Sequence, residues 1–312
     1  MRFTVPIILL CLLLVIGGCL GQSSSSRSSM TPEEAAIQQR QAAAADALDK
    51  AMQLYHDGEF LEPDAAFEYL DEAIELDPTL VTARYQRALL LFNRGSVDEA
   101  LADVEAVIKV KPDHIKAHFT RGYILQSRGD YVGAAKDFSM VIGKDDTIAE
   151  VYVQRGFCYA SLDRMDDAIY DFSQALAINP AHRDANYHRG LAYMALGDYK
   201  AALYDLTQAL TLDSQSYEII MARAATSMKL KRYDRAVSDF KRAIVIEPNQ
   251  SALYALLGEG LAGTGDIKGA IKAVKKALLL SRAENNPEMA ATYQEQLDEY
   301  LALPAPAPKP EE

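Results

Sequence analysis

Hydrophobic and polar positions along most of the chain follow the periodicity of amphipathic helices, and the helical segments come in pairs. In residues 183–212, apolar side chains recur three or four positions apart on both sides of the break "LGDY" (196–199). Gly197 and Asp198 in that break suit a tight turn, because glycine readily adopts the positive φ with which many helices end. The pattern predicts two antiparallel helices joined by a short turn.

The paired segments recur with a period of 34 residues. Small residues and prolines mark this period in constant phase, at Ala66, Ala100, Ala134, Ala168, Ala202, Ala236 and Ala270, at Gly122, Gly156, Gly190 and Gly258, and at Pro78, Pro112, Pro180 and Pro248. Because glycine and alanine have almost no side chain, two antiparallel helices can approach closely where they cross, and proline ends the second helix of a unit. The period predicts an all-α solenoid of about seven helical hairpins.

One unit matches the small-large-small pattern of the tetratricopeptide repeat (TPR) family at Gly156, Tyr159, Ala168, Phe172, Ala175 and Pro180. The chain resembles that family over about 31–303, which implies a right-handed α-solenoid whose first helices line a concave groove. The repeats are expected at about 47–80, 81–114, 115–148, 149–182, 183–216, 217–250 and 251–284. The first unit departs from the pattern, because it has Leu54 where glycine is usual and a longer break, "HDGEFLEPD" (56–64).

Both ends of the array carry signals for additional helices, as repeat arrays need caps on their terminal units. Thr31-Pro32-Glu33-Glu34 is a capping box with proline at the first helical position, so a helix is predicted to begin there. Residues 287–302 place Met289, Tyr293, Leu297 and Tyr300 on one face, which predicts a C-terminal capping helix. Residues 304–312, "PAPAPKPEE", are predicted to be a disordered Pro-rich tail.

Arginine and aspartate share the period, always 16 residues apart, as Arg87 and Asp103, Arg121 and Asp137, Arg155 and Asp171, Arg189 and Asp205, and Arg223 and Asp239. Each arginine falls in the middle of a first helix, and its aspartate falls at the matching level of the antiparallel partner. We expect a bidentate ion pair inside each hairpin. A basic stripe for phosphates is the competing interpretation, and it is disfavoured because each arginine has its own carboxylate.

The N-terminus has the pattern of a signal peptide. Arg2 precedes an apolar run from Val5 to Ile16, which is too short to span a bilayer comfortably. Ile16, Gly17 and Gly18 then precede Cys19, and this segment resembles the lipobox of bacterial lipoproteins. Residues 1–18 are therefore predicted to be a lipoprotein-type signal peptide and 19–30 a Ser-rich tether.

The lipobox resemblance implies that Cys19 carries a lipid (a diacylglycerol, with palmitate as a typical acyl chain) and anchors the protein in a membrane. By resemblance to diderm lipoproteins, Leu20 stands where an aspartate is associated with retention in the inner membrane, so in an organism with two membranes the periplasmic face of the outer membrane is expected. The chain as a whole resembles bacterial TPR lipoproteins of the cell envelope. The alternative is an ordinary secretory signal with an incidental cysteine, which predicts a secreted protein.

Composition and charge narrow the function classes. A formal net charge of −12 argues against nucleic acid as a partner, because binding to phosphates draws on clustered Lys and Arg. No phosphate loop, nucleophile elbow or dinucleotide fingerprint occurs, so we expect no cofactor and no enzymatic activity. The triplet Arg128-Gly129-Asp130 falls on the turn of a hairpin, and the repeat explains its position better than an integrin ligand does.

A possible metal site and a possible nucleophilic cysteine are also better explained by structural roles of their residues. His114 and His118 have the i, i+4 spacing of a helical metal pair, but no third ligand is evident, so no metal site is predicted. Cys158 has no neighbouring base in the sequence, and a buried, inert thiol is expected there.

Function is therefore expected from a surface. By resemblance to the family, the concave groove would include Tyr85, Leu89, Phe119, Tyr123, Phe157, Tyr187, Leu191, Met194, Met221 and Met228. Aromatic and methionine side chains suit an extended peptide or an amphipathic helix. The predicted function is a membrane-anchored scaffold that binds segments of envelope proteins and helps to assemble or recruit a complex. The alternatives are a self-associating (homo-oligomeric) assembly factor and a regulatory module for a separately encoded enzyme.

Overall fold

A computed structural model describes residues 30–303 of the chain. Within that range the chain folds into fifteen helices and one short β-ribbon, so the prediction of an all-α array of helical hairpins is confirmed. The helices are α1 (Pro32–Gln53), α2 (Pro63–Leu76), α3 (Val81–Asn93), α4 (Val97–Val110), α5 (Ile115–Ser127), α6 (Tyr131–Ile142), α7 (Ala149–Ser161), α8 (Met165–Ile178), α9 (Arg183–Ala195), α10 (Tyr199–Leu212), α11 (Tyr217–Lys229), α12 (Tyr233–Ile246), α13 (Ser251–Gly263), α14 (Ile267–Ala283) and α15 (Pro287–Ala302). The ribbon pairs β1 (Tyr55–His56) with β2 (Glu59–Phe60).

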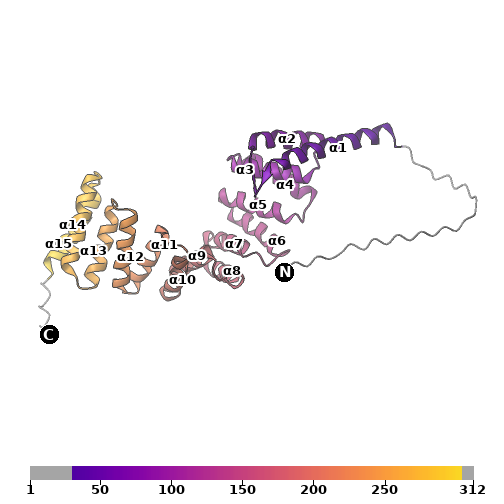
Figure 1. Cartoon of the computed structure of the whole chain (residues 1–312). Coiled ribbons are helices and arrows are strands. Elements are labelled where there is room, and N and C mark those ends of the chain that lie inside the picture. The colour runs from indigo at the N-terminus through magenta and orange to yellow at the C-terminus, as the bar shows by residue number, and fades with distance from the viewer. Residues whose placement is uncertain (1–29, 304–312) are drawn as a thin grey trace, which may run out of the picture.

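The helices follow one another along an elongated array. Each helix packs against the one before it and the one after it, and Figure 1 shows α1 and α15 at opposite ends. The core is accordingly a series of small apolar clusters, one after another along the array, in place of a single centre. In such an array each unit is stabilised mainly by its neighbours.

In four hairpins the two helices cross where the first helix carries glycine. A Cβ atom added to Gly156 of α7 would lie 2.8 Å from Cε1 of Phe172 on α8, and one added to Gly258 of α13 would lie 2.6 Å from Cγ2 of Val274 on α14. These distances are shorter than van der Waals contact, so the helices pack this closely only because no side chain is present. The period-34 glycines therefore set the spacing between paired helices.

A glycine followed by an aspartate forms the turn between the paired helices in several hairpins. Gly197 has a φ of +79°, which ends α9, and Asp198 follows it as the N-cap of α10. The Asp198 carboxylate accepts a hydrogen bond from the backbone N–H of Ala201 at 3.0 Å. Asp130 and Asp266 cap α6 and α14 in the same way, so the Gly-Asp pairs of the sequence are helix ends.

The two ends of the array differ from its middle. α1 begins at a capping box formed by Thr31 and Glu34 and continues without a break to Gln53. The helix predicted to begin at Thr31 and the first helix of the unit expected at 47–80 are thus one helix. At the other end, Tyr293 and Leu297 of α15 are buried against α13 and α14.

Residues 1–29 and 304–312 lie outside the described part of the chain, and with them the signal peptide, Cys19, most of the tether and the Pro-rich tail. Among the helices of residues 30–303, none has the length and apolar character to cross a membrane.

Candidate protein-binding site

The structure joins each of the five arginine–aspartate pairs that the sequence places 16 residues apart. Arg155 Nε and Nη2 each donate to a different carboxylate oxygen of Asp171, both at 2.7 Å, which is bidentate geometry. The other four pairs have the same arrangement, with every N–O distance between 2.7 and 2.9 Å. The aspartate side chains are at most 5% exposed, and the arginine stems lie beside them at the hairpin interface.

The arginines also reach the preceding hairpin. The remaining terminal nitrogen of Arg155 donates to Ser139 Oγ at 3.1 Å, and that of Arg189 donates to Ser173 Oγ at 3.0 Å. The equivalent nitrogen of Arg87 contacts the carboxylate of Asp71. Each of these arginines therefore links its own two helices to the second helix of the hairpin before it. These contacts set the stacking of neighbouring hairpins and with it the position of the first helices, which carry the candidate groove.

The break after α1 forms a structure that no other hairpin has. Asp57 and Gly58 take positive φ values of 49° and 97°, the conformation of the tight two-residue turn that Asp-Gly favours in β-hairpins. Strands β1 and β2 flank this turn, and the rings of Tyr55 and Phe60 pair across them with centroids 5.0 Å apart. The ribbon thereby projects two aromatic side chains beside the face of α3.

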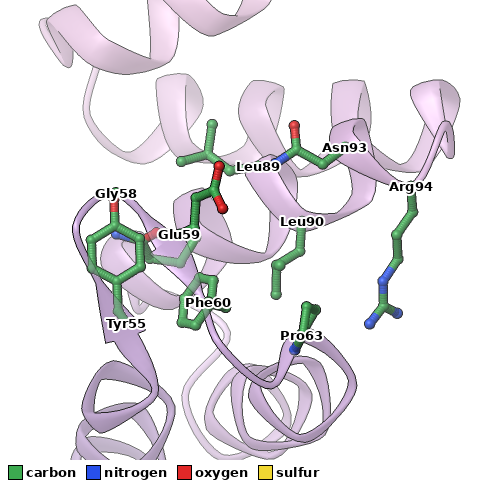
Figure 2. Close-up of a pocket in the computed structure, with 10 residues that line it drawn as sticks. Tyr55, Gly58, Glu59, Phe60, Pro63, Leu89, Leu90, Asn93 and Arg94 are labelled. Atoms are coloured by element: carbon green, nitrogen blue, oxygen red, sulfur yellow. The ribbon is translucent and has the colours of Figure 1, made fainter.

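A hollow of about 500 Å³ lies between this ribbon and α3. Figure 2 shows Tyr55 and Phe60 on the ribbon across from Leu89 and Leu90 on α3. Glu59 on the ribbon, and Asn93 and Arg94 at the end of α3, add polar groups to its lining. Apolar side chains combined with a few polar groups are the usual composition of a binding site.

A second hollow of about 350 Å³ adjoins the first and extends it along the array. The two share Tyr55, Gln86 and Leu89, and the second continues over Tyr85 and Phe119 towards the start of α7. Three of the residues expected in the groove, Tyr85, Leu89 and Phe119, therefore meet on one surface. Tyr85 is held in place by a hydrogen bond of 3.2 Å between its hydroxyl and that of Thr120.

Gln86 is the polar residue common to both hollows. Its side-chain oxygen Oε1 is buried and has no hydrogen-bond partner among the residues that the structure describes. A buried acceptor without a donor costs free energy, on the order of 1–3 kcal/mol.

The other residues expected in the groove have different surroundings. The Tyr123 hydroxyl donates to Glu150 at 2.9 Å, and the Phe157 ring packs on those of Tyr131 and His188, at centroid distances of 6.2 and 5.5 Å. Tyr187, Met221 and Met228 pack against the apolar clusters of neighbouring hairpins, and Leu191 and Met194 are half-buried on α9. These residues do not line the two hollows.

Carboxylates make the middle of this face acidic. Glu150 accepts from Tyr123 and from Gln154 and lies 3.3 Å from Nε2 of His182. Burial, and then the charge of Glu150, raise the pKa of Tyr123 well above its ordinary value, and the pKa of Tyr187 is raised by burial and by Glu218. The aromatic residues here keep their hydroxyl protons and face negative charge.

Tyr55, Phe60 and Gln86 are among the residues of the hollows that the sequence analysis did not single out. The signal that could have found the first two was present, because Tyr55 and Phe60 flank an Asp-Gly dipeptide in the one break that departs from the repeat. No sequence signal marks Gln86, since its isolation depends on what packs around it.

The residues considered for chemistry have structural surroundings. His114 caps α5 by accepting from the N–H of Ala117, and His118 lies between Asp137 and the Pro112 carbonyl oxygen, at 2.7 and 2.9 Å. Cys158 is fully buried, and burial raises its pKa to about 12. Arg128 of the Arg-Gly-Asp turn contacts Asp98 at 2.6 Å. Within residues 30–303 no group of three His, Cys, Asp or Glu side chains is arranged to hold a metal ion.

Comparison with known proteins agrees with this architecture. Models of the tetratricopeptide repeat match residues 85–147, 149–182 and 193–259. No curated protein sequence matches the chain.

Several solved structures share the fold. PilW, a widely conserved type IV pilus biogenesis factor, is 21% identical over 69% of this chain and 98% of its own, with a TM-score of 0.56. PilF of Pseudomonas aeruginosa is 16% identical over 70% of this chain and 98% of its own, with a TM-score of 0.57. YrrB, a TPR protein with an unusual peptide-binding site, is 18% identical over 58% of this chain and 94% of its own, with a TM-score of 0.51. At these identities the likeness shows the fold.

Proposed function

Because the chain belongs to the tetratricopeptide repeat family of protein-interaction scaffolds, we propose that it binds a segment of another protein on the face formed by the β1–β2 ribbon, α3 and α5. The observation that carries this proposal is the pair of adjoining hollows lined by Tyr55, Tyr85, Leu89 and Phe119. Repeat arrays of this family are typically non-catalytic, and binding is the function that the site supports.

The site favours a particular kind of segment. The apolar residues that line the two hollows fit large aliphatic or aromatic side chains. Removing apolar surface from water is the main source of binding free energy. The partner is thus a protein segment that carries bulky apolar residues.

The N-terminal sequence supports a proposal for the location of the scaffold. We propose that Cys19 is lipidated and anchors the array to the periplasmic face of the outer membrane, where it would assist the assembly or recruitment of an envelope complex. The structural neighbour PilW is a type IV pilus biogenesis factor, which makes assembly of a surface structure one process in which to look for the partner.

Leu89 is the side chain with which to test the binding face, because it lines both hollows. The full chain, its Leu89→Glu variant and a Leu212→Glu control are used to capture partners from the envelope fraction. Leu212 is an exposed leucine on α10, away from the hollows. A bound protein should be recovered with the unmodified chain and the control, and about tenfold less with Leu89→Glu, because a carboxylate in an apolar site loses its hydration.

Circular dichroism establishes that both variants keep the helical fold. Equal recovery of the partner with Leu89→Glu and with the unmodified chain would rule out this face as the binding site.

The anchor is tested separately by growing cells with a labelled fatty acid. The unmodified chain should incorporate the label and fractionate with the outer membrane, whereas Cys19→Ala should do neither, because the thiol is the attachment point. Label on Cys19→Ala, or none on the unmodified chain, would contradict the anchor and leave the binding face unaffected.

A further inference from the structure

The outer faces of the first and last hairpins have opposite charge. α2 carries five acidic residues, Asp64, Glu68, Asp71, Glu72 and Glu75, and no Lys or Arg. α14 carries five basic residues, Lys268, Lys272, Lys275, Lys276 and Arg282, and no Asp or Glu. A wholly basic helix is unexpected in a chain with a net charge of −12.

The charges occupy equivalent positions in the repeat. Residues 64, 68, 71 and 72 are each 204 residues, or six periods of 34, before residues 268, 272, 275 and 276. Every one of the four is Asp or Glu in α2 and Lys in α14. The spacing i, i+4, i+7 and i+8 places each set along one side of its helix. The two helices thus present stripes of the same geometry and opposite sign.

Most of these charges are free at the surface. Glu68 and Glu72 on α2 are exposed, and neither has an ion-pair partner within 4.0 Å in the described part of the chain. Asp64 and Asp71 contact Arg94 and Arg87 of the next hairpin. On α14, all four lysines are exposed and none lies in an ion pair of residues 30–303.

The two stripes cannot neutralise each other within one molecule. α2 belongs to the first hairpin and α14 to the seventh, and Figure 1 shows them at opposite ends of the array. A second copy of the chain, however, offers each stripe its complement, with matching spacing. Like ends repel one another, so only the contact of α2 with α14 of another copy is favoured.

We propose that copies of this chain associate end to end, with the acidic stripe of α2 in one copy against the basic stripe of α14 in the next. The exposed side chain of Leu279, one turn beyond the lysines, adds apolar area to the basic face. The contact is heterologous, so it extends into a chain of copies, or closes when two antiparallel copies make it twice. The acidic stripe borders the first hollow, because Pro63 of α2 and Arg94, which pairs with Asp64, line it. The association is tested without the partner proposed for that face.

The test uses purified full-length chains with two different affinity tags, mixed and captured through one tag. Unmodified copies should be co-captured at about 50 mM NaCl and about tenfold less at about 500 mM, because salt screens exposed charges. The acidic-stripe variant Glu68→Lys/Glu72→Lys and the basic-stripe variant Lys272→Glu/Lys275→Glu should each lose co-capture with themselves by about tenfold or more. Mixing these two variants should restore it, because each then offers the stripe that the other lacks.

The matched control is Lys136→Glu/Lys144→Glu, which makes the same change in charge in the middle of the array. Lys136 occupies the repeat position of Glu68 and Lys272 but lies on α6, so this variant should associate like the unmodified chain. Unchanged helicity by circular dichroism excludes misfolding as the cause of any loss.

The proposal is overturned if unmodified copies are not co-captured at low salt, if either stripe variant still associates with itself, or if the mixed variants stay apart. Vesicles that contain phosphatidylglycerol provide a further reading. Suppose that the chain shows no co-capture but binds these vesicles in a salt-sensitive way, and that Lys272→Glu/Lys275→Glu abolishes this binding. An anionic membrane would then be the occupant of the basic stripe instead of a second copy.

Discussion

At the scale of single residues, the arginine that pairs with aspartate in five of the hairpins joins neighbouring helices. Arg155 binds Asp171 with two nitrogens and the hydroxyl of Ser139 with the third, so one planar group joins three helices. Its guanidinium also lies within 6 Å of the rings of Tyr152 and Tyr159. Burial raises the pKa of the Asp171 carboxyl above its ordinary value, and the contact with Arg155 offsets part of that rise. The hydrogen bonds to Asp171 in turn raise the pKa of Arg155 above its ordinary value.

Removing one side chain of the Arg155–Asp171 ion pair is expected to lower the free energy of unfolding by more than the intact pair contributes to it. Arg155→Met leaves the Asp171 carboxylate buried without a counter-charge, which should lower the free energy of unfolding by about 3–5 kcal/mol. Arg155→Met/Asp171→Leu should recover much of that loss, because no charge is then left buried. Urea unfolding followed by circular dichroism measures both.

The control for this prediction is in the same hairpin. Arg164 pairs with Asp167 at 2.7 Å, and both side chains are about half exposed, so Arg164→Met should cost about 1 kcal/mol or less. A cost for Arg155→Met no greater than that of Arg164→Met would show that the buried pair does not stabilise the array.

At the scale of elements, the hairpin is a tightly packed unit whose geometry depends on a missing side chain. Alanine is the better helix former by about 1 kcal/mol, and by that criterion Gly258 in the interior of α13 is unfavourable. The distance of 2.6 Å between an added Cβ and Val274 explains why glycine is nevertheless suited to the position. Packing between the two helices outweighs the local preference of one of them.

This balance predicts a change of sign. Gly258→Ala should destabilise the protein by about 1–3 kcal/mol, because the crowding with Val274 exceeds the gain in helix propensity. In a Val274→Ala background the same substitution should stabilise the protein, because the space is then available. Thermal unfolding of the four proteins gives the coupling between the two sites. Stabilisation by Gly258→Ala in both backgrounds would show that crowding is unimportant at this crossing.

The β1–β2 ribbon is the element that distinguishes one end of the array. In the other hairpins three residues join the paired helices, whereas nine separate α1 from α2. The additional residues fold back as a ribbon whose Tyr55 and Phe60 face α3 and complete the larger hollow. An irregular connection thus converts a regular surface into a distinct binding site.

At the scale of the whole molecule, the repeat separates different tasks onto different faces. The first helices α3 and α5 carry the hollows, whereas the second helices α2 and α14 carry the charged stripes at the two ends. In an array whose units contact mainly their neighbours, the basic stripe on α14 is far along the chain of helices from the hollows on α3 and α5. A lipid on Cys19 would attach the molecule at its N-terminal end, beyond α1.

The fold and the ion pairs could be derived from the sequence because they depend on short-range regularity. A period of 34 with helical spacing determines paired helices, and a separation of 16 residues places Arg155 opposite Asp171 once two helices are antiparallel. The contact of Arg155 with Ser139 follows from the same regularity, since position 139 and its equivalents 71, 105, 173 and 207 are all polar. That signal was in the sequence and was not used.

The binding face could be derived only in part. Family resemblance placed Tyr85, Leu89 and Phe119 on the face that contains the hollows, and it placed Tyr123 and Phe157 there with equal weight. Tyr123 instead binds Glu150, and Phe157 packs on His188, in both cases a residue of the next hairpin. Periodicity assigns all these residues the same kind of position and does not distinguish an open aromatic side chain from a covered one.

The sequence by itself therefore determined the helical pairs, their close crossings, the register of the ion pairs and the opposite charge of α2 and α14, because each depends on residue spacing within a helix or a hairpin. Only the tertiary structure decided that the ribbon at 55–60 stands beside α3, that two hollows adjoin there, and that the Gln86 oxygen between them has no partner. Those features depend on how side chains from α1, α3, α5 and α7 fill the space between hairpins. That packing is set by shape in three dimensions, which residue spacing alone does not encode.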